Sequence, residues 1–415
     1  MTGKFNRGLS RVFAGILGLL VLLAAVGEVR SQTLRDLETI RRSATLTPDD
    51  LQIMMIFVTS QFSLMENAGE VTELNKPLID MESVSTSTSS NIQTRQQYVS
   101  EFARLIKENY GGLYQQGLDL AGQESPEAKE LGANKKLAAA ITLVMSGHPT
   151  LIEDLQGMLE DDSALVRACA VKGFWQDSMK EYLAQPEAGA ELAGILSSLD
   201  ERLNTENSAE VIMYAAMAAG LVDNAQSTAL LQKCVARRVS QYQSWEVSRE
   251  SADGEILGQL IQVAQQKLTA NDRRGATELL RSATELYISA YHRYRMGKAY
   301  RKPDDNKEIP LLTEDNRLSL KSLLIIGEIE FMEICNRPTS NNNSRAVFMA
   351  LRDASESNLP NAVDSLTGLA GLVQQSFSIY DGWTAPGELP APPAAIVQKA
   401  ENLQKIKANV IKISS

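Results

Sequence analysis

Apolar residues recur at intervals of three, four and seven along most of the chain, which is the spacing of one face of an α-helix. A clear example begins at Thr47-Pro48-Asp49, where capping residues and a proline suited to a first helical turn precede apolar positions from Leu51 to Leu64. A spaced series of alternating apolar and polar runs bounded by Asn-Gly or Asp-Gly turns is not found. The pattern therefore predicts an all-α fold.

The helical spacing continues through residues 96–120, where Gly111 and Gly112 are expected to break the helix in two. The Ser/Thr-rich stretch 83–94 before it is expected to be a polar loop. Further helices are predicted at 225–245, 255–268, 273–296, 314–335, 345–355 and 360–377.

A proline-rich spacer precedes a last predicted helix, residues 394–413, which has a narrow apolar stripe. Two interpretations fit this helix. It either docks back as a cap on the preceding helices or remains a tethered helix that pairs with a partner or with itself. The stripe consists of Ile396, Leu403, Ile406, Val410 and Ile413.

Residues 151–174 combine an amphipathic helix, an acidic turn and a second, Ala-rich helix opened by Val166-Arg167-Ala168. This segment resembles a HEAT repeat, in which a turn Asp and a helix Arg form a structural ladder between repeats. The resemblance implies that architectural role for Asp162 and Arg167, with Val166 in the same repeat motif. A weaker echo follows at 208–219, where Ile212 stands in the place of the Arg, and another precedes at 135–141, so that the resemblance covers residues 130–222.

These patterns predict an α-solenoid of HEAT-like helix pairs, in which the C-terminal helices either continue the solenoid or form an added bundle. The expected organisation is a signal peptide at 1–31, an N-terminal helical region at 32–130, HEAT-like repeats at 131–250, a C-terminal helical region at 251–385, and the spacer with its terminal helix at 386–415.

The N-terminus has the three parts of a secretory signal peptide. Lys4, Arg7 and Arg11 precede an uncharged stretch, residues 12–26, and small residues offer cleavage after Gly27 or Ser31. An uncleaved anchor is the alternative, although about 15 residues of helix reach only roughly 22 Å, short of a ~30 Å hydrocarbon core. The sequence thus predicts a periplasmic or secreted protein with no membrane span after cleavage.

Charge and cysteine content exclude other classes. The formal net charge is −10, which disfavours nucleic-acid binding, because phosphate neutralisation needs an excess of Lys and Arg. Three widely spaced cysteines, Cys169, Cys234 and Cys335, exclude a dense disulfide framework. We expect them to be buried hydrophobic side chains, with one disulfide as the alternative.

No motif for catalysis, a metal or a cofactor is recognisable. The two histidines, His148 and His292, do not stand beside a nucleophile and a carboxylate, and the common zinc and phosphate-binding signatures are missing. Adjacent carboxylates before helices are more typical of caps than of acid/base pairs. The pairs considered are Asp49/Asp50, Asp161/Asp162 and Asp304/Asp305.

One segment combines aromatic and cationic residues in this acidic chain. The tyrosines at 287, 291 and 294 share a helical face, so they are expected to pack in the core while the cations stay solvated. The alternative is a patch that binds an anion or an acidic protein partner. Its residues would be Tyr291, Arg293, Arg295, Lys298, Arg301 and Lys302.

The sequence therefore predicts an exported helical-repeat scaffold that binds another protein and is not an enzyme. A cell-envelope polymer-binding protein or a carboxylate-dependent hydrolase or lyase is one alternative, because two carboxylates across a cleft would suffice. A structural component that self-associates through residues 394–413 is another.

Overall fold

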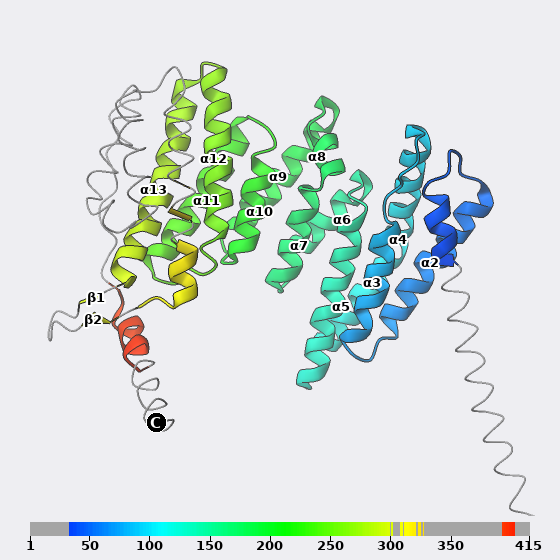
Figure 1. Cartoon of the computed structure of the whole chain (residues 1–415), viewed down its shortest axis with the longest axis horizontal. Helices are drawn as coiled ribbons and strands as arrows, with labels where there is room; N and C mark the ends of the chain where they lie inside the picture. Colours follow the sequence, from blue (N-terminus) through cyan, green and yellow to red (C-terminus); the bar gives the residue numbers. More distant parts are fainter. Residues whose placement is uncertain are drawn as a thin grey trace, which may run out of the picture. The chain divides into compact units, whose positions relative to one another are not determined.

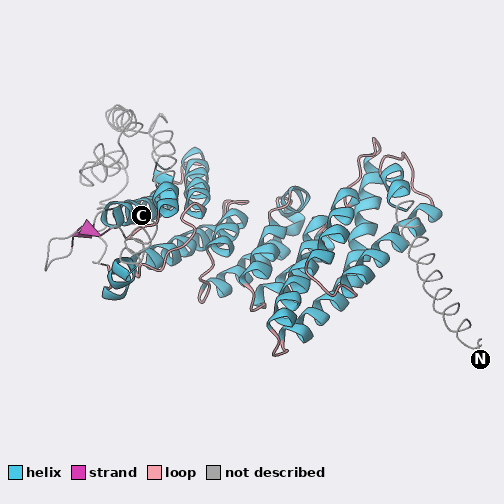
Figure 2. Ribbon diagram, turned by 60° about the horizontal axis from the view of Figure 1, so that its bottom comes forward, coloured by secondary structure: helices cyan, strands magenta, loops and turns pink. Residues whose placement is uncertain are grey.

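The computed structural model describes residues 33–298, 300–301, 308–309, 311–320, 323–324, 327 and 392–402. Most of these residues are helical (Figure 1, Figure 2). Strands in the described part are two short segments, β1 (Tyr300–Arg301) and β2 (Glu308–Ile309), which pair antiparallel. The predicted all-α fold is confirmed. The chain folds as two compact units, Met1–Tyr182 and Leu183–Ser415; the predicted signal peptide lies outside the described residues.

The first unit consists of helices that alternate between two rows (Figure 1). In one row α2 packs against α4, and in the other α3 packs against α5 and α5 against α7. Across the rows α2 packs against α3 and, most extensively, α4 packs against α5. The elements are α2 (Pro48–Glu66), α3 (Thr72–Val84), α4 (Ile92–Ala121), α5 (Pro126–Met145), η1 (Pro149–Leu151), α6 (Ile152–Gly157), η2 (Met158–Glu160), α7 (Ala164–Phe174) and α8 (Asp177–Leu183).

Side chains cap the free backbone amides at several helix starts. At α2 the Asp50 N–H donates to Thr47 Oγ1 (3.2 Å) and the Thr47 N–H donates to the Asp50 carboxylate (2.8 Å), a reciprocal capping box. Asn91 and Ser125 cap α4 and α5 through their side-chain oxygens. The predicted helix start at Thr47-Pro48-Asp49 is confirmed, and Asp50 acts as a capping residue.

α4 runs without interruption through Gly111 and Gly112, so the expected break there is wrong. A glycine costs a helix about 1 kcal/mol, and the packing of α4 along α2 and α5 outweighs that cost. Another glycine pair allows this packing. A Cβ at Gly117 would lie 2.8 Å from the Gly132 carbonyl oxygen, and one at Gly132 would lie 2.6 Å from that of Gly117. The backbones of α4 and α5 therefore approach more closely than side chains would permit.

α3 is a helix that the sequence pattern did not predict. Pro77 lies in its interior, where proline removes a backbone donor and usually ends a helix. The buried residues Leu74, Pro77, Met81 and Val84 nevertheless recur at intervals of three and four, so one face of α3 packs against the unit. Tertiary packing of this face outweighs the cost of the proline.

The second unit has the same alternation. α9 packs against α11 and α11 against α13, whereas α10 packs against α12. The predicted helices at 225–245, 255–268 and 273–296 are confirmed within a few residues. The elements are η3 (Pro186–Ala188), α9 (Gly189–Leu203), α10 (Ala209–Ala219), α11 (Ala225–Gln243), α12 (Ala252–Thr269) and α13 (Arg273–Lys298).

The described part of the terminal helix, residues 394–402, is docked rather than free. Val397 and Ala400 pack against Ile309 of β2, and Tyr300 and Leu311 complete the apolar cluster. These residues are therefore packed, although against the β1–β2 hairpin and Leu311 rather than as the predicted cap on the preceding helices. The rest of the predicted stripe, and the predicted helices at 345–355 and 360–377, lie outside the described residues.

Candidate functional site

A groove of about 540 Å³ opens on the surface of the first unit. Because α5 packs against both α3 and α7, it forms the floor of the groove, and the other two helices form its walls. This volume falls within the range typical of ligand sites, about 300–1,000 Å³. The groove is lined by Asn75, Leu78, Ile79, Glu82 and Ser85 of α3 and its C-cap, Ile141, Val144 and Met145 of α5, and Cys169, Lys172 and Gln176 of α7 and the turn after it.

Local sequence fixes the floor of the groove. α5 ends at Met145, and Gly147 then adopts the left-handed conformation (φ 57°), which glycine tolerates without strain. The Gly147 carbonyl accepts a hydrogen bond from Ser178 Oγ (3.1 Å). A Cβ at position 147 would lie 2.5 Å from Ser178 Oγ. The chain therefore turns sharply after α5, with Met145 held at the groove.

The lining is mainly apolar. Ile79 is 63% exposed, and Leu78, Ile141 and Met145 are half-buried, so the groove presents aliphatic and thioether surface to solvent. Burial raises the pKa of the Cys169 thiol to about 11, so Cys169 is protonated at neutral pH and contributes soft, apolar surface. Such a lining suits binding of apolar groups rather than acid/base chemistry.

Two charges stand on opposite walls. Glu82 on α3 and Lys172 on α7 are both exposed, and within the described part of the chain neither makes an ion pair. The sequence pattern pointed to Cys169 alone among the groove residues, and only as a buried hydrophobic side chain. It assigned no helix to 72–84, so it could not place Ile79 and Glu82 opposite Lys172.

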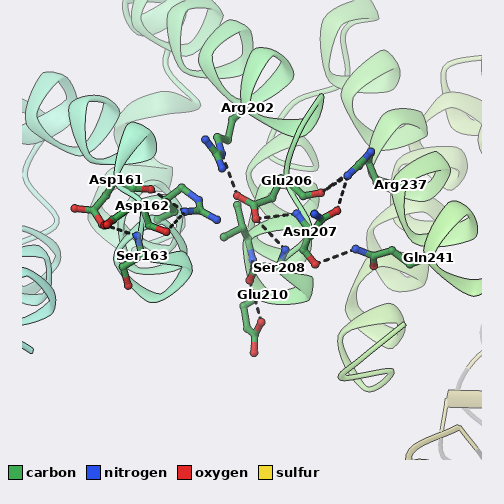
Figure 3. A network of polar contacts seen from close by, with 12 residues as sticks. Asp161, Asp162, Ser163, Arg202, Glu206, Asn207, Ser208, Glu210, Arg237 and Gln241 are labelled. Carbon is green, nitrogen blue, oxygen red and sulfur yellow. Dashed lines mark hydrogen bonds and ion pairs between the residues drawn. The ribbon is translucent and has the colours of Figure 1, made fainter. Parts of the chain in front are cut away.

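Of the residues predicted for the HEAT ladder, Asp162 lies in the turn before α7 (Figure 3), and Val166 and Arg167 lie in the first turn of α7. Arg167 is buried, and its Nη1 donates to the carbonyl oxygens of Asp161 (2.7 Å) and Asp162 (3.0 Å). Asp161 has the buried carboxylate of the turn: it accepts from Lys136 Nζ (2.9 Å) and from the Ser163 N–H (2.7 Å). Asp162 is exposed and also pairs with Lys136. Val166 is fully buried in the core, so these residues fix α7 against α5.

A similar turn precedes α10 in the second unit (Figure 3). The buried Glu206 carboxylate accepts from the N–H groups of Asn207 (2.9 Å) and Ser208 (2.8 Å). Arg237 of α11 donates to the Glu206 carbonyl oxygen (2.7 Å). The acid two residues before the Ser at the N-cap position thus accepts from the backbone N–H of that Ser in both turns. An arginine binds the turn carbonyl in each case, although Ile212 stands in place of Arg167 in the local sequence.

The predicted cationic patch is described only in part. Arg293 is 7% exposed, and its guanidinium stacks on the Trp245 ring (4.2 Å), so it faces the interior rather than the surface. Burial lowers the pKa of Arg293. Tyr287 and Tyr294 are buried on the same side of α13, as expected for core residues. The side chains of Tyr291, Arg295, Lys298, Arg301 and Lys302 lie outside the described residues.

The remaining candidates for chemistry have structural partners or lie outside the described part. His148 caps η1, where its Nδ1 accepts from the Thr150 N–H (3.3 Å), and burial lowers the pKa of its imidazole. Cys169 and Cys234 are free thiols. Asp304, Asp305, Cys335 and the His292 side chain are not described. Within the described residues no three His, Cys, Asp or Glu side chains gather as metal ligands would.

The described part of the chain is therefore an all-α protein with an apolar surface groove. None of its described helices combines the length and apolarity needed to cross a membrane. In comparisons with known proteins, no family model, no curated protein and no solved structure matches this chain.

Proposed function

We propose that this chain is an exported α-solenoid of HEAT-like helix pairs that acts as a scaffold and binds a segment of another protein in the groove between α3, α5 and α7. The observation that carries the proposal is this groove, whose lining exposes Ile79 and the half-buried Leu78, Ile141 and Met145 to solvent. A large aliphatic side chain that is 63% exposed gains free energy when a partner covers it, by about 25 cal/mol per Å² of apolar area.

Two features support the solenoid. Within each unit, helices two places apart in the sequence pack against each other, α3 with α5 and α5 with α7 in the first unit, α9 with α11 and α11 with α13 in the second. In each of the acidic turns before α7 and α10, an arginine side chain donates a hydrogen bond to a backbone carbonyl oxygen of the turn. Repeated helix pairs expose long surfaces that suit binding of extended or helical partner segments.

Export rests on the basic and uncharged N-terminal segment, residues 1–31. The alternative of a carboxylate-dependent hydrolase is not favoured by the groove. Glu82 is the one carboxylate in its lining, whereas that chemistry needs two. The buried Asp161 is already bound by Lys136 and by the Ser163 N–H.

The experiment is affinity capture from envelope extract with the mature chain and two matched variants. Ile79→Glu places a charge in the groove, and Ile92→Glu places the same charge at an equally exposed isoleucine (63%) at the start of α4, outside the groove. We expect a stoichiometric protein partner that is lost with Ile79→Glu and kept with Ile92→Glu, with both variants melting like the unmodified chain. A partner retained by both variants would rule out the groove as its site.

A further inference from the structure

The shape of the groove restricts what can occupy it. Its lining on α3 extends from Asn75 to Ser85, about 15 Å at 1.5 Å per residue. An occupant that follows this wall as a helix would therefore contribute about ten residues, or nearly three turns.

The backbone of the groove favours a helix over an extended peptide. A strand-like peptide binds by pairing its main chain with a free sheet edge. The floor and walls of this groove are helices, whose interior amide and carbonyl groups are bonded within each helix apart from the donor that Pro77 removes from α3, so they offer no free edge for strand pairing. A helical partner satisfies its own backbone and presents apolar side chains at i, i+3 or i+4, and i+7. Leu78, Ile79 and Met145 form a matching apolar surface.

The two wall charges specify the flanks of that helix. Glu82 on the α3 wall and Lys172 on the α7 wall are exposed and make no ion pair within the described residues. The other polar lining residues, Asn75, Ser85 and Gln176, are neutral. A complementary helix would have basic residues on the flank facing α3 and acidic residues on the flank facing α7.

We infer that the groove binds an amphipathic helix of a partner protein, an inference that rests on the proposed scaffold function. The apolar face of this helix would be about three turns long and would lie between one basic and one acidic flank. Global charge alone makes a different prediction. A chain of net charge −10 attracts a helix with two basic flanks most strongly. The order of binding of differently flanked helices therefore distinguishes recognition in the groove from general electrostatic attraction.

The test uses three synthetic peptides of about 18 residues, or roughly five helical turns. They share one leucine face and differ in their flanks: Lys and Glu on opposite sides, Lys on both, or Glu on both. Binding to the mature chain is measured by fluorescence anisotropy at physiological salt. We expect the mixed peptide to bind about fivefold more tightly than either of the others, because each mismatched flank replaces an attraction by a repulsion.

Single charge reversals then move the preference in opposite directions. Glu82→Lys should make the peptide with two Glu flanks the tightest, and Lys172→Glu should make the peptide with two Lys flanks the tightest. Ile79→Glu should abolish binding of the mixed peptide, and Ile92→Glu should leave it unchanged. The inference is overturned if the Lys-flanked peptide binds best to every variant, or if no peptide binds. A partner captured through Ile79 together with no peptide binding would retain the scaffold function and refute the helical ligand.

Discussion

Arg238 and Asp253 form an ion pair in which both side chains are completely buried. Arg238 Nε donates to Asp253 Oδ1 (2.6 Å) and Nη2 donates to Oδ2 (3.0 Å), so the pair is bidentate. Tyr242 OH donates to the same carboxylate (2.6 Å), and burial raises the pKa of Tyr242 well above its ordinary value, so the phenol remains a donor. Arg238 also donates to the Ser248 carbonyl oxygen (2.9 Å) and thereby ties α11 to the loop before α12.

We expect that removing one partner of this pair destabilises the second unit strongly. Asp253→Leu should lower the free energy of unfolding by about 3–5 kcal/mol, because it leaves a buried guanidinium without its counter-charge. The double variant Arg238→Met/Asp253→Leu should lose less than Asp253→Leu alone, because no charge is then left buried. Urea titration of four proteins, the unmodified chain, Arg238→Met, Asp253→Leu and the double variant, measures this coupling. Losses that simply add would show that the two groups act independently.

Lys136 should control how the first unit responds to acid. Its hydrogen bond to Asp162 is the largest cause of the lowered pKa of that carboxyl. Ionised Asp162 therefore contributes stability above its unfolded pKa of about 3.9, and this contribution is lost as the pH falls through its lower folded-state pKa. Lys136→Met should cost about 3 kcal/mol at pH 7, since Asp161 is also left buried without its cation.

The difference between Lys136→Met and the unmodified chain should shrink as the pH falls below about 4, because protonated Asp162 no longer needs a cation. Lys129→Met, an exposed lysine on the same helix, is the control and should change little at any pH. Thermal melts between pH 7 and pH 3 test this prediction. A difference that stays constant would show that Lys136 stabilises α5 by packing alone.

Two glycines of α4 should respond in opposite ways to alanine. Gly111→Ala should stabilise the protein by about 0.5–1 kcal/mol, because a Cβ there meets nothing within 4 Å and glycine is a poor helix residue. Gly117→Ala should destabilise it by about 1–3 kcal/mol, because its Cβ would meet the α5 backbone. Melting temperatures of the two variants give the sign directly. A stabilising Gly117→Ala would mean that α4 and α5 do not pack this closely.

The thiol of Cys169 should react as a high-pKa cysteine. In a Cys335→Ser background, alkylation of Cys169 should increase about tenfold per pH unit from pH 7.5 to 9.5 without a plateau, because its pKa is about 11. Cys234 is completely buried and should stay unmodified until the protein unfolds. Mass spectrometry of the two peptides follows both rates. A plateau near pH 8.5 would show that Cys169 is solvated like a free cysteine.

The sequence predicts helices well where one apolar face repeats, as in α11 to α13, and where capping chemistry is local, as at Thr47. It fails where tertiary packing opposes a local signal. No helix was predicted over residues 72–84, where α3 forms despite Pro77, and Gly111 and Gly112 suggested a break that packing against α5 prevents. The groove was beyond sequence reasoning because its lining comes from three helices that become neighbours only through folding. For the same reason, the sequence pointed to Asp162, whereas Asp161 has the buried carboxylate.

Site-specific photo-crosslinking in living cells tests the central claim most directly. A photoreactive residue is placed at position 79, in the groove, or at position 92, which has the same exposure of 63% outside it. Our account predicts one discrete crosslinked polypeptide from position 79, suppressed by Lys172→Glu, and none from position 92. Equal crosslinking from both positions, or a product at 92 alone, would contradict a scaffold that binds its partner between α3, α5 and α7.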